Sequence, residues 1–251
     1  MDNPGIAEVR RINLLKVPLD LMKEEDMEKV VRTLAARKER QQIILLGFFD
    51  FMKCRRDPER RRMMKEAALI IPTSKALIKG VRFLKKGEAV RYMPFEFVIR
   101  LLGILENLHG TIYILGSHPR ELNISSANLR DSFPGLRIVG RHTGYFPPDM
   151  EEDIVLAIKK AAPNLLLAGG GLKGNDLWIL RRKGEFQTGM YLWCRECFDI
   201  FCGKAQRLSR KQWDRGLYLV PRFLKNPLRI FQLFTRLYYN LLLLIYRIRK
   251  L

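Results

Sequence analysis

Residues 111–171 read TIYILGSHPRELNISSANLRDSFPGLRIVGRHTGYFPPDMEEDIVLAIKKAAPNLLLAGGG and decide the fold of this chain. Three short apolar runs lie within them, TIYILG, RIVG and NLLLAGGG, and each ends in glycine. Such runs of Ile, Val, Leu and Tyr are typical of strands buried on both faces, and the two longer segments between them have helical spacing. The sequence therefore predicts an α/β fold with a Rossmann-like, largely parallel sheet and helices on both of its faces.

Glycine follows the first and the last of these expected strands, as Gly116 and as the triplet 169–171. The carboxyl ends of parallel strands meet at one edge of a sheet, where glycine lets backbone amides approach a phosphate. This arrangement favours a nucleotide-type ligand. The same glycines also fit plain tight turns, which are common in α/β proteins, so this feature alone leaves both interpretations open.

Four motifs follow one another within the block: LG-x-x-P at 115–119, A-x-LR at 127–130, FPGL-x-IVG at 133–140 and GYFPP at 144–148. Their order resembles the WecG/TagA/CpsF glycosyltransferases, also called glycosyltransferase family 26. The resemblance covers about residues 11 to 240. Outside the block, the resemblance includes an opening strand and helix at 12–31 and a helix and strand before the active-site loop at 55–72. It ends in two closing segments, at 198–207 and 216–229.

The resemblance implies an inverting glycosyltransferase that needs neither a metal nor a cofactor. Members of the family transfer an N-acetylhexosamine, often of the N-acetylmannosamine type, from a UDP-sugar donor to a polyprenyl-diphosphate-linked sugar. They do so on the cytoplasmic face of bacterial membranes, in the synthesis of surface polysaccharide or teichoic acid. The substrate-binding positions implied on this chain are Arg91, Gly116, Ser117, Gly144, Tyr145, Phe146, Gly170, Gly171 and Asn175.

The chain departs from the family pattern where the chemistry is expected. The family loop PDG, whose Asp is the proposed general base, reads Pro72-Thr73-Ser74 here. The early T-x-N motif falls on Leu45 and Gly47, so two polar groups of the sugar site are absent. A hydroxyl such as that of Thr73 titrates far above neutral pH and cannot act as a general base without a partner that takes the proton.

Two carboxylates elsewhere are expected to substitute as the catalytic base. Glu96 stands in RYMPFEF where the family has R-V-T-G-x-D-L, and Asp176 ends KGND where the family has PKQE. The family's paired glycines before FD are Arg195 and Glu196. Two hypotheses therefore stand: an active transferase that uses Glu96 or Asp176, and a catalytically inactive homologue that binds nucleotide-sugar or lipid-linked glycan.

The net charge of +20 over 251 residues predicts an anionic partner. After Gly203 the chain has 12 basic residues against one acid, Asp214, which suggests two parts: an α/β domain at 1–203 and a basic appendage at 204–251. By analogy with the family, Arg207, Arg222 and Arg229 are expected to approach the diphosphate, the alternative being solvated surface charge. No recognised nucleic-acid module accompanies the basic residues, so no nucleic-acid partner is expected.

The appendage ends in an amphipathic helix expected from Leu228 onward, with a narrow polar stripe and a wide apolar face. Its longest uncharged run, 237–246, is about half of the ~20 residues needed to cross a bilayer. We therefore expect a peripheral location on the inner face of the plasma membrane, against anionic lipid. A helix that packs against protein, or that mediates homo-oligomer formation, is the alternative.

Three remaining features predict little chemistry. Cys194 and Cys197 form a C-x-x-C motif without further zinc ligands nearby, so no metal site is expected. The first residues, MDNPGIAEVRR, contain no apolar signal segment, and a cytoplasmic chain with reduced thiols follows. The basic run KCRRDPERRR at 53–62 is expected to start a helix at Asp57-Pro58 and to place its arginines on a solvated face.

Overall fold

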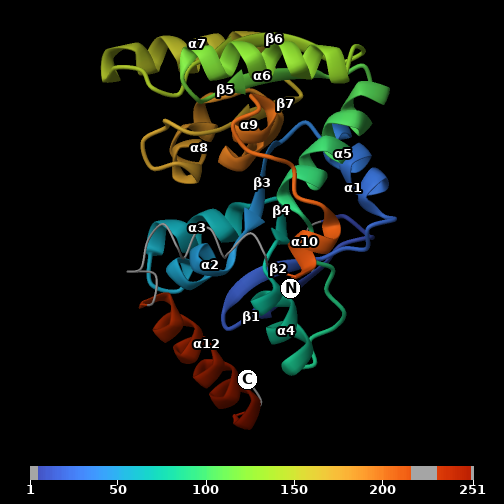
Figure 1. Cartoon of the computed structure of the whole chain (residues 1–251), viewed down its shortest axis with the longest axis vertical. Coiled ribbons are helices and arrows are strands. Elements are labelled where there is room, and N and C mark those ends of the chain that lie inside the picture. The colour runs from blue at the N-terminus through green and yellow to red at the C-terminus, as the bar shows by residue number, and fades with distance from the viewer. Residues whose placement is uncertain (1–4, 216–230, 250–251) are drawn as a thin grey trace.

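The fold is built around a six-stranded sheet in which every pair of neighbours is parallel, in the order β4-β3-β8-β7-β5-β6 (Figure 1). The computed structural model describes residues 5–215 and 231–249. The strands are β3 (Arg40–Leu46), β4 (Leu69–Pro72), β5 (Thr111–Leu115), β6 (Arg137–His142), β7 (Leu165–Ala168) and β8 (Gly189–Trp193). This architecture confirms the predicted α/β fold with a parallel sheet.

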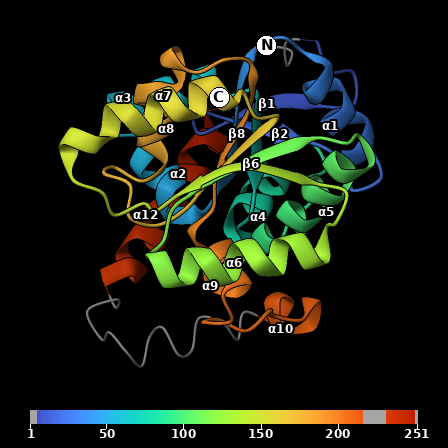
Figure 2. The ribbon, with the colours of Figure 1, turned by 90° about the horizontal axis from the view of Figure 1, so that it is seen from above.

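Helices cover both faces of the sheet, and alternate residues of each central strand point to opposite layers. Ile43 of β3 belongs to the core beneath one layer, whereas Ile44 belongs to the core beneath the other. The first layer contains α1 (Met27–Ala36), α5 (Pro94–Asn107), α6 (Pro119–Ser132) and α9 (Arg195–Phe201). The second contains α2 (Phe48–Cys54), α3 (Pro58–Glu66), α4 (Lys75–Phe83), α7 (Glu151–Ala161) and α8 (Asp176–Arg182). Figure 2 shows α6 and α7 on opposite sides of β6.

The decisive block forms the strand–helix–strand–helix–strand unit that its sequence predicts, from β5 through α6, β6 and α7 to β7. β5 and β7 pair with each other and are almost wholly buried. The prediction that β6 is buried on both faces is wrong: its residues alternate between exposed and half-buried. The reason is the strand order, because β6 pairs only with β5 and forms the edge of the sheet.

The opening segment forms an antiparallel hairpin, β1 (Arg10–Leu14) and β2 (Val17–Leu21), where a single strand was expected before α1. The two-residue turn, Leu15 and Lys16, has positive φ at both positions, the pattern of tight hairpin turns. Glycine and asparagine usually mark such turns. Their absence here explains why the sequence did not predict the hairpin.

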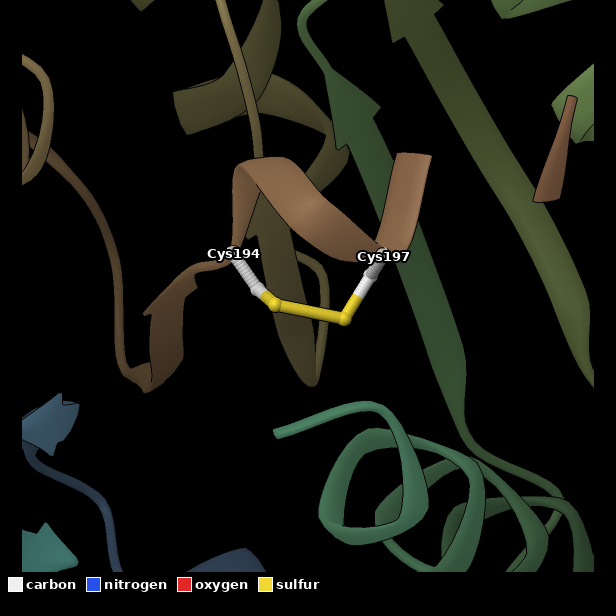
Figure 3. The surroundings of a disulfide bond; sticks show 2 residues. All are labelled: Cys194 and Cys197. Atoms are coloured by element: carbon white, nitrogen blue, oxygen red, sulfur yellow. A yellow bond between two sulfur atoms is a disulfide. The ribbon is translucent and has the colours of Figure 1, made fainter. Parts of the chain in front are cut away.

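The expectation of reduced thiols is wrong for two cysteines, because Cys194 and Cys197 form a disulfide (Figure 3). The two residues stand at the start of α9, where a three-residue separation brings their Cα atoms to 5.6 Å, within the usual range for a disulfide. Both are buried. The bridge ties the end of β8 to the first turn of α9.

The C-terminal helix α12 (Phe231–Ile248) divides its apolar residues between two faces. Tyr239 and Leu243 are buried against the core that includes α2 and α4. Phe234, Leu237 and Ile248 are 65%, 63% and 71% exposed. The prediction that this helix packs against protein is therefore confirmed for one of its faces, and apolar side chains on the other face are exposed. None of the described helices is both long and apolar enough to cross a membrane.

Candidate functional site

The loops that follow β5, β6 and β7 are joined by backbone hydrogen bonds at the carboxyl edge of the sheet. Gly116 N donates to His142 O at 3.0 Å and Ser117 N donates to Gly170 O at 2.8 Å. Gly144 N in turn donates to Ser117 O at 3.1 Å. The structure thus brings six of the predicted binding positions together, and we call them the glycine cluster: Gly116, Ser117, Gly144, Tyr145, Gly170 and Gly171.

Two glycines of the cluster are required by backbone geometry. Gly116 has φ +149°, and a Cβ there would lie 2.8 Å from Gly169 Cα. Gly171 has φ +100°, and a Cβ there would lie 2.6 Å from the carbonyl carbon of Gly144. Real Cβ atoms do not approach other atoms so closely, and residues other than glycine rarely adopt these φ values. The close contact of the loops therefore depends on glycine.

An aromatic pair covers one side of the glycine cluster. The rings of His118 and Tyr145 stack in parallel with centroids 3.9 Å apart, and Tyr145 remains 51% exposed. Phe146 is half-buried and meets His142 edge to face. His118 was not among the predicted site residues, since a lone histidine before a helix carries no sequence signal. The pair presents a flat surface of the kind on which a planar ring stacks.

Arg195 brings a positive charge to the glycine cluster from the end of β8. Its side-chain carbons and Nε lie 3.6 Å from the position that a Cβ on Gly170 would occupy. The ring of Phe198, one turn later in α9, fills the space beside Gly169. The disulfide holds the turn that carries Arg195, because Cys194 and Cys197 flank it. Glycine in the triplet therefore makes room for side chains of α9.

Glu96 lines two neighbouring cavities, of about 400 and 140 Å³, beside the start of the appendage. It lies in the first turn of α5, and its Oε1 is 3.7 Å from Nη2 of Arg207. Arg91 lines the larger cavity, with its guanidinium 4.1 Å from the ring centroid of Trp213 in α10 (Arg210–Arg215). Glu196 of α9 lines the smaller cavity.

Thr73 follows β4 and is held by backbone contacts. Its Oγ1 donates to Leu46 O at 3.1 Å, and its own carbonyl oxygen accepts from Nε of Arg91 at 3.1 Å. Beside it, Gly47 opens α2 without a side chain. A Cβ on Gly47 would lie 3.6 Å from Oδ2 of Asp50 and 4.0 Å from Oγ1 of Thr73. Asp50, which the sequence did not single out, is thus a carboxylate beside Gly47, which the hydroxyl of Thr73 also borders.

Asp176 is engaged by Arg60, whose Nη1 lies 3.2 and 3.1 Å from its two carboxylate oxygens. The side chains of Arg60 and Asp176 are 12% and 18% exposed. Burial raises the pKa of Asp176 above its ordinary value, although the charge of Arg60 acts in the opposite direction. The prediction of a solvated arginine face on α3 is therefore wrong for Arg60. The neighbouring Asn175 is exposed, with φ +56° at the start of α8.

The predicted diphosphate residues lie partly outside the described part of the chain. Arg207 is exposed, with its guanidinium carbon 5.8 Å from the ring centroid of Phe95. Arg222 and Arg229 fall within 216–230 and lie outside the described residues. Within residues 5–215 and 231–249, no group of three or more His, Cys, Asp or Glu side chains is arranged to hold a metal ion.

The fold and the site define a Rossmann-like protein whose strand ends converge on a glycine-lined, positively charged edge. A family model, Glycosyl transferase WecG/TagA/CpsF family, matches residues 12–251, and the chain belongs to this family. It is similar to N-acetylglucosaminyldiphosphoundecaprenol N-acetyl-beta-D-mannosaminyltransferases of Staphylococcus aureus. The enzymes of strains NCTC 8325 / PS 47 and COL are each 22% identical over 146 residues, 58% of this chain and 56% of the relative. That of strain MRSA252 is 21% identical over the same length.

Proposed function

We propose that this chain transfers an N-acetylhexosamine of the N-acetylmannosamine type from a UDP-sugar to a polyprenyl-diphosphate-linked sugar in cell-envelope polymer synthesis. Family membership over residues 12–251 and the printed activity of the Staphylococcus aureus relatives support the reaction class. The observation that carries the proposal is the glycine cluster. Three strand ends meet there through close glycine contacts, with Arg195 beside Gly170. This is the edge of a parallel sheet at which such folds bind phosphate-bearing ligands.

The proposed binding mode uses the two sides of this edge. The stacked pair of His118 and Tyr145 supports a planar base, and Arg195 supports the diphosphate. The acceptor, with its own diphosphate, approaches from the side of the cavities that Arg91 and Arg207 border. The predicted base candidates differ in setting. Glu96 lines both cavities, whereas Asp176 is bound by Arg60.

The reaction is tested by UDP release from UDP-N-acetylhexosamines in the presence of a polyprenyl-diphosphate N-acetylglucosamine acceptor. We expect release that depends on both substrates, with the sugar attached to the acceptor. Arg195→Met should weaken UDP binding by about tenfold, because it removes a charge-assisted contact worth roughly 1.5 kcal/mol. Lys160→Met, on exposed α7, is the matched control that removes a charge elsewhere. If no UDP is released with any common donor and acceptor, the proposed transferase function is refuted.

A second function is favoured by one observation, the absence of a carboxylate at Thr73. An inactive homologue would bind nucleotide-sugar or lipid-linked glycan without turning it over. It would bind UDP with the same dependence on Arg195 while no acceptor product forms under any condition. Calorimetric titration with UDP, run beside the transfer assay, separates this outcome from a protein that binds no nucleotide.

We further propose a peripheral location on the inner face of the plasma membrane, through the exposed apolar face of α12. Phe234, Leu237 and Ile248 are exposed there, and Arg236 and Arg249 are basic residues of the same segment. A helix of this composition lies in the interface, with its cations toward anionic headgroups. A homo-oligomer formed through the same face is the competing proposal.

Co-sedimentation with phosphatidylglycerol vesicles tests the location. Leu237→Glu should abolish salt-sensitive binding, whereas Leu156→Glu should not. Leu156 is a leucine of α7 with 46% exposure, and α7 lies at the opposite end of the molecule from α12 (Figure 1). Unchanged sedimentation of the Leu237 variant would refute attachment through this face. Light scattering in the absence of lipid measures self-association. If the exposed face of α12 joins two copies of the chain, Leu237→Glu should abolish that self-association.

A further inference from the structure

The missing carboxylate at position 73 leaves the proposed transfer without an obvious base. The two predicted substitutes are each committed to another contact. Both oxygens of Asp176 face Nη1 of Arg60, and the side chain is only 18% exposed. Glu96 points into cavities beside the appendage, where it meets Arg207.

Asp50 differs from these two in position and in exposure, and its own contact with Nζ of Lys53 lies on the exposed surface. Its carboxylate lies next to Gly47, and so does the hydroxyl of Thr73. A Cβ on Gly47 would be 3.6 Å from Oδ2 of Asp50 and 4.0 Å from Oγ1 of Thr73. The carboxylate is therefore at the ends of β3 and β4, where the resembling family presents its aspartate. The side chain is 48% exposed, so an acceptor hydroxyl can reach it.

The surroundings of Asp50 place it in the charged centre of this edge. Burial raises the pKa of Asp176 and of the Cys54 thiol, and the negative charge of Asp50 adds to both shifts. For Arg60, burial lowers the pKa while the charges of Asp176 and Asp50 raise it, with a net increase. Nζ of Lys53, one turn later in α2, is 3.4 Å from Oδ1. This contact lies on the exposed surface and leaves Oδ2 directed toward Gly47.

Resting on the proposed transferase function, we propose that Asp50 is the general base of the reaction. Its carboxylate accepts the proton of the acceptor hydroxyl as that oxygen forms a bond to the anomeric carbon of the donor sugar. The bond from the anomeric carbon to the β-phosphate oxygen breaks, and UDP leaves with the electron pair. The proton then passes from Asp50 to water. The base thus comes from the helix that follows β3, where the family pattern takes it from the loop after β4.

Gly47 lies beside both groups and adds no side chain of its own. A Cβ at position 47 would make ordinary van der Waals contacts with Oδ2 of Asp50 and Oγ1 of Thr73, at 3.6 and 4.0 Å. The asparagine that the family pattern has here would instead place an amide beside these two groups.

The test is Asp50→Asn in the UDP-release assay, with UDP affinity measured by calorimetry on the same protein. We expect kcat to fall by about a hundred- to ten-thousand-fold, the usual contribution of a general base. UDP affinity should stay within about threefold, since Asp50 is proposed to touch the acceptor and not the nucleotide. Glu96→Gln and Asp176→Asn are the comparison variants, and we expect smaller losses of kcat from both.

A rescue separates catalysis from a structural role at the start of α2. Thr73→Asp in the Asp50→Asn background returns a carboxylate to the other side of Gly47, and we expect it to restore at least tenfold in kcat. If Asp50 had a purely structural role in α2, Thr73→Asp would not restore kcat. Wild-type kcat in Asp50→Asn, or no rescue, would overturn the assignment of Asp50. A wild-type chain that releases no UDP with any donor would overturn the transferase function itself, so the two failures are distinct.

Discussion

Asp20 is the most consequential buried charge in the described part of the chain, and its removal gives a sharp test of how the sheet is held. The residue is 1% exposed in β2. Its two carboxylate oxygens accept from Nε and Nη2 of Arg11 at 2.7 Å each, and Oδ2 also accepts from the backbone N of Ile70 at 2.7 Å. One side chain thereby joins the hairpin to β4.

Asp20→Ala should lower the free energy of unfolding by about 3 to 5 kcal/mol. That is the usual cost of removing one partner of a buried ion pair, because the remaining charge stays buried without compensation. Arg11 has a side-chain exposure of 11% and keeps only the carbonyls of Ala67 and Ala68 as acceptors. For a chain of this size, each kcal/mol corresponds to about 2–4 °C in the melting temperature. We therefore expect a fall of about 6–20 °C.

Urea unfolding followed by circular dichroism measures this loss. Asp20→Asn keeps an oxygen for the amide of Ile70 and should cost about half as much. Glu28→Ala is the matched control, since Glu28 pairs with Arg32 on the surface at exposures of 57% and 47%. Its removal should cost less than about 1 kcal/mol. A loss for Asp20→Ala as small as that of the surface control would refute the reasoning.

Three further perturbations test other parts of the structure. Arg60→Met should lower the free energy of unfolding by about 2–3 kcal/mol at pH 8. Because burial raises the folded-state pKa of Asp176 above its unfolded value, the folded protein protonates Asp176 more readily as the pH falls, and the loss measured by urea unfolding should shrink toward pH 5. A loss that does not depend on pH would contradict this. Gly171→Ala should strain the backbone by about 1–3 kcal/mol and lower UDP affinity by calorimetry, and an unchanged affinity would argue against nucleotide binding there. Tyr239→Ala should release α12 to limited proteolysis at the cost of a fully buried ring, while Tyr238→Ala, 42% exposed, should leave the cleavage pattern unaltered.

The sequence predicted those elements of the fold whose signals are local. β5 and β7 are short apolar runs ended by glycine, and α6 begins with Pro119 at its first position, as helices often do. The exposure of β6 depends on which strand lies at the edge, and strand order is not encoded within the strand. The hairpin turn at Leu15 and Lys16 lacks the residues that normally signal it.

The candidate site was predicted where a motif fixes the backbone and missed where partners are distant in the chain. Glycines 116, 144 and 171 are needed for the close approach of three loops, and a resemblance in their spacing is enough to find them. Arg60 and Asp176 are 116 residues apart, so their ion pair depends on the packing of α3 against α8. Asp50 carries no motif at all. Its importance follows only from the approach of β3 and β4.

The proximity of Asp50 to position 73 also restricts which sequences this site can accept. If aspartate were returned at position 73 while Asp50 remained, two carboxylates would face each other across Gly47, at most a few ångströms from one Cβ position. Like charges that close raise the pKa of one member, which then holds a proton and cannot act as a base near neutral pH. One carboxylate beside Gly47 is therefore better suited to the chemistry than two. Thr73 keeps a hydrogen-bonding group against Leu46 O without adding that charge.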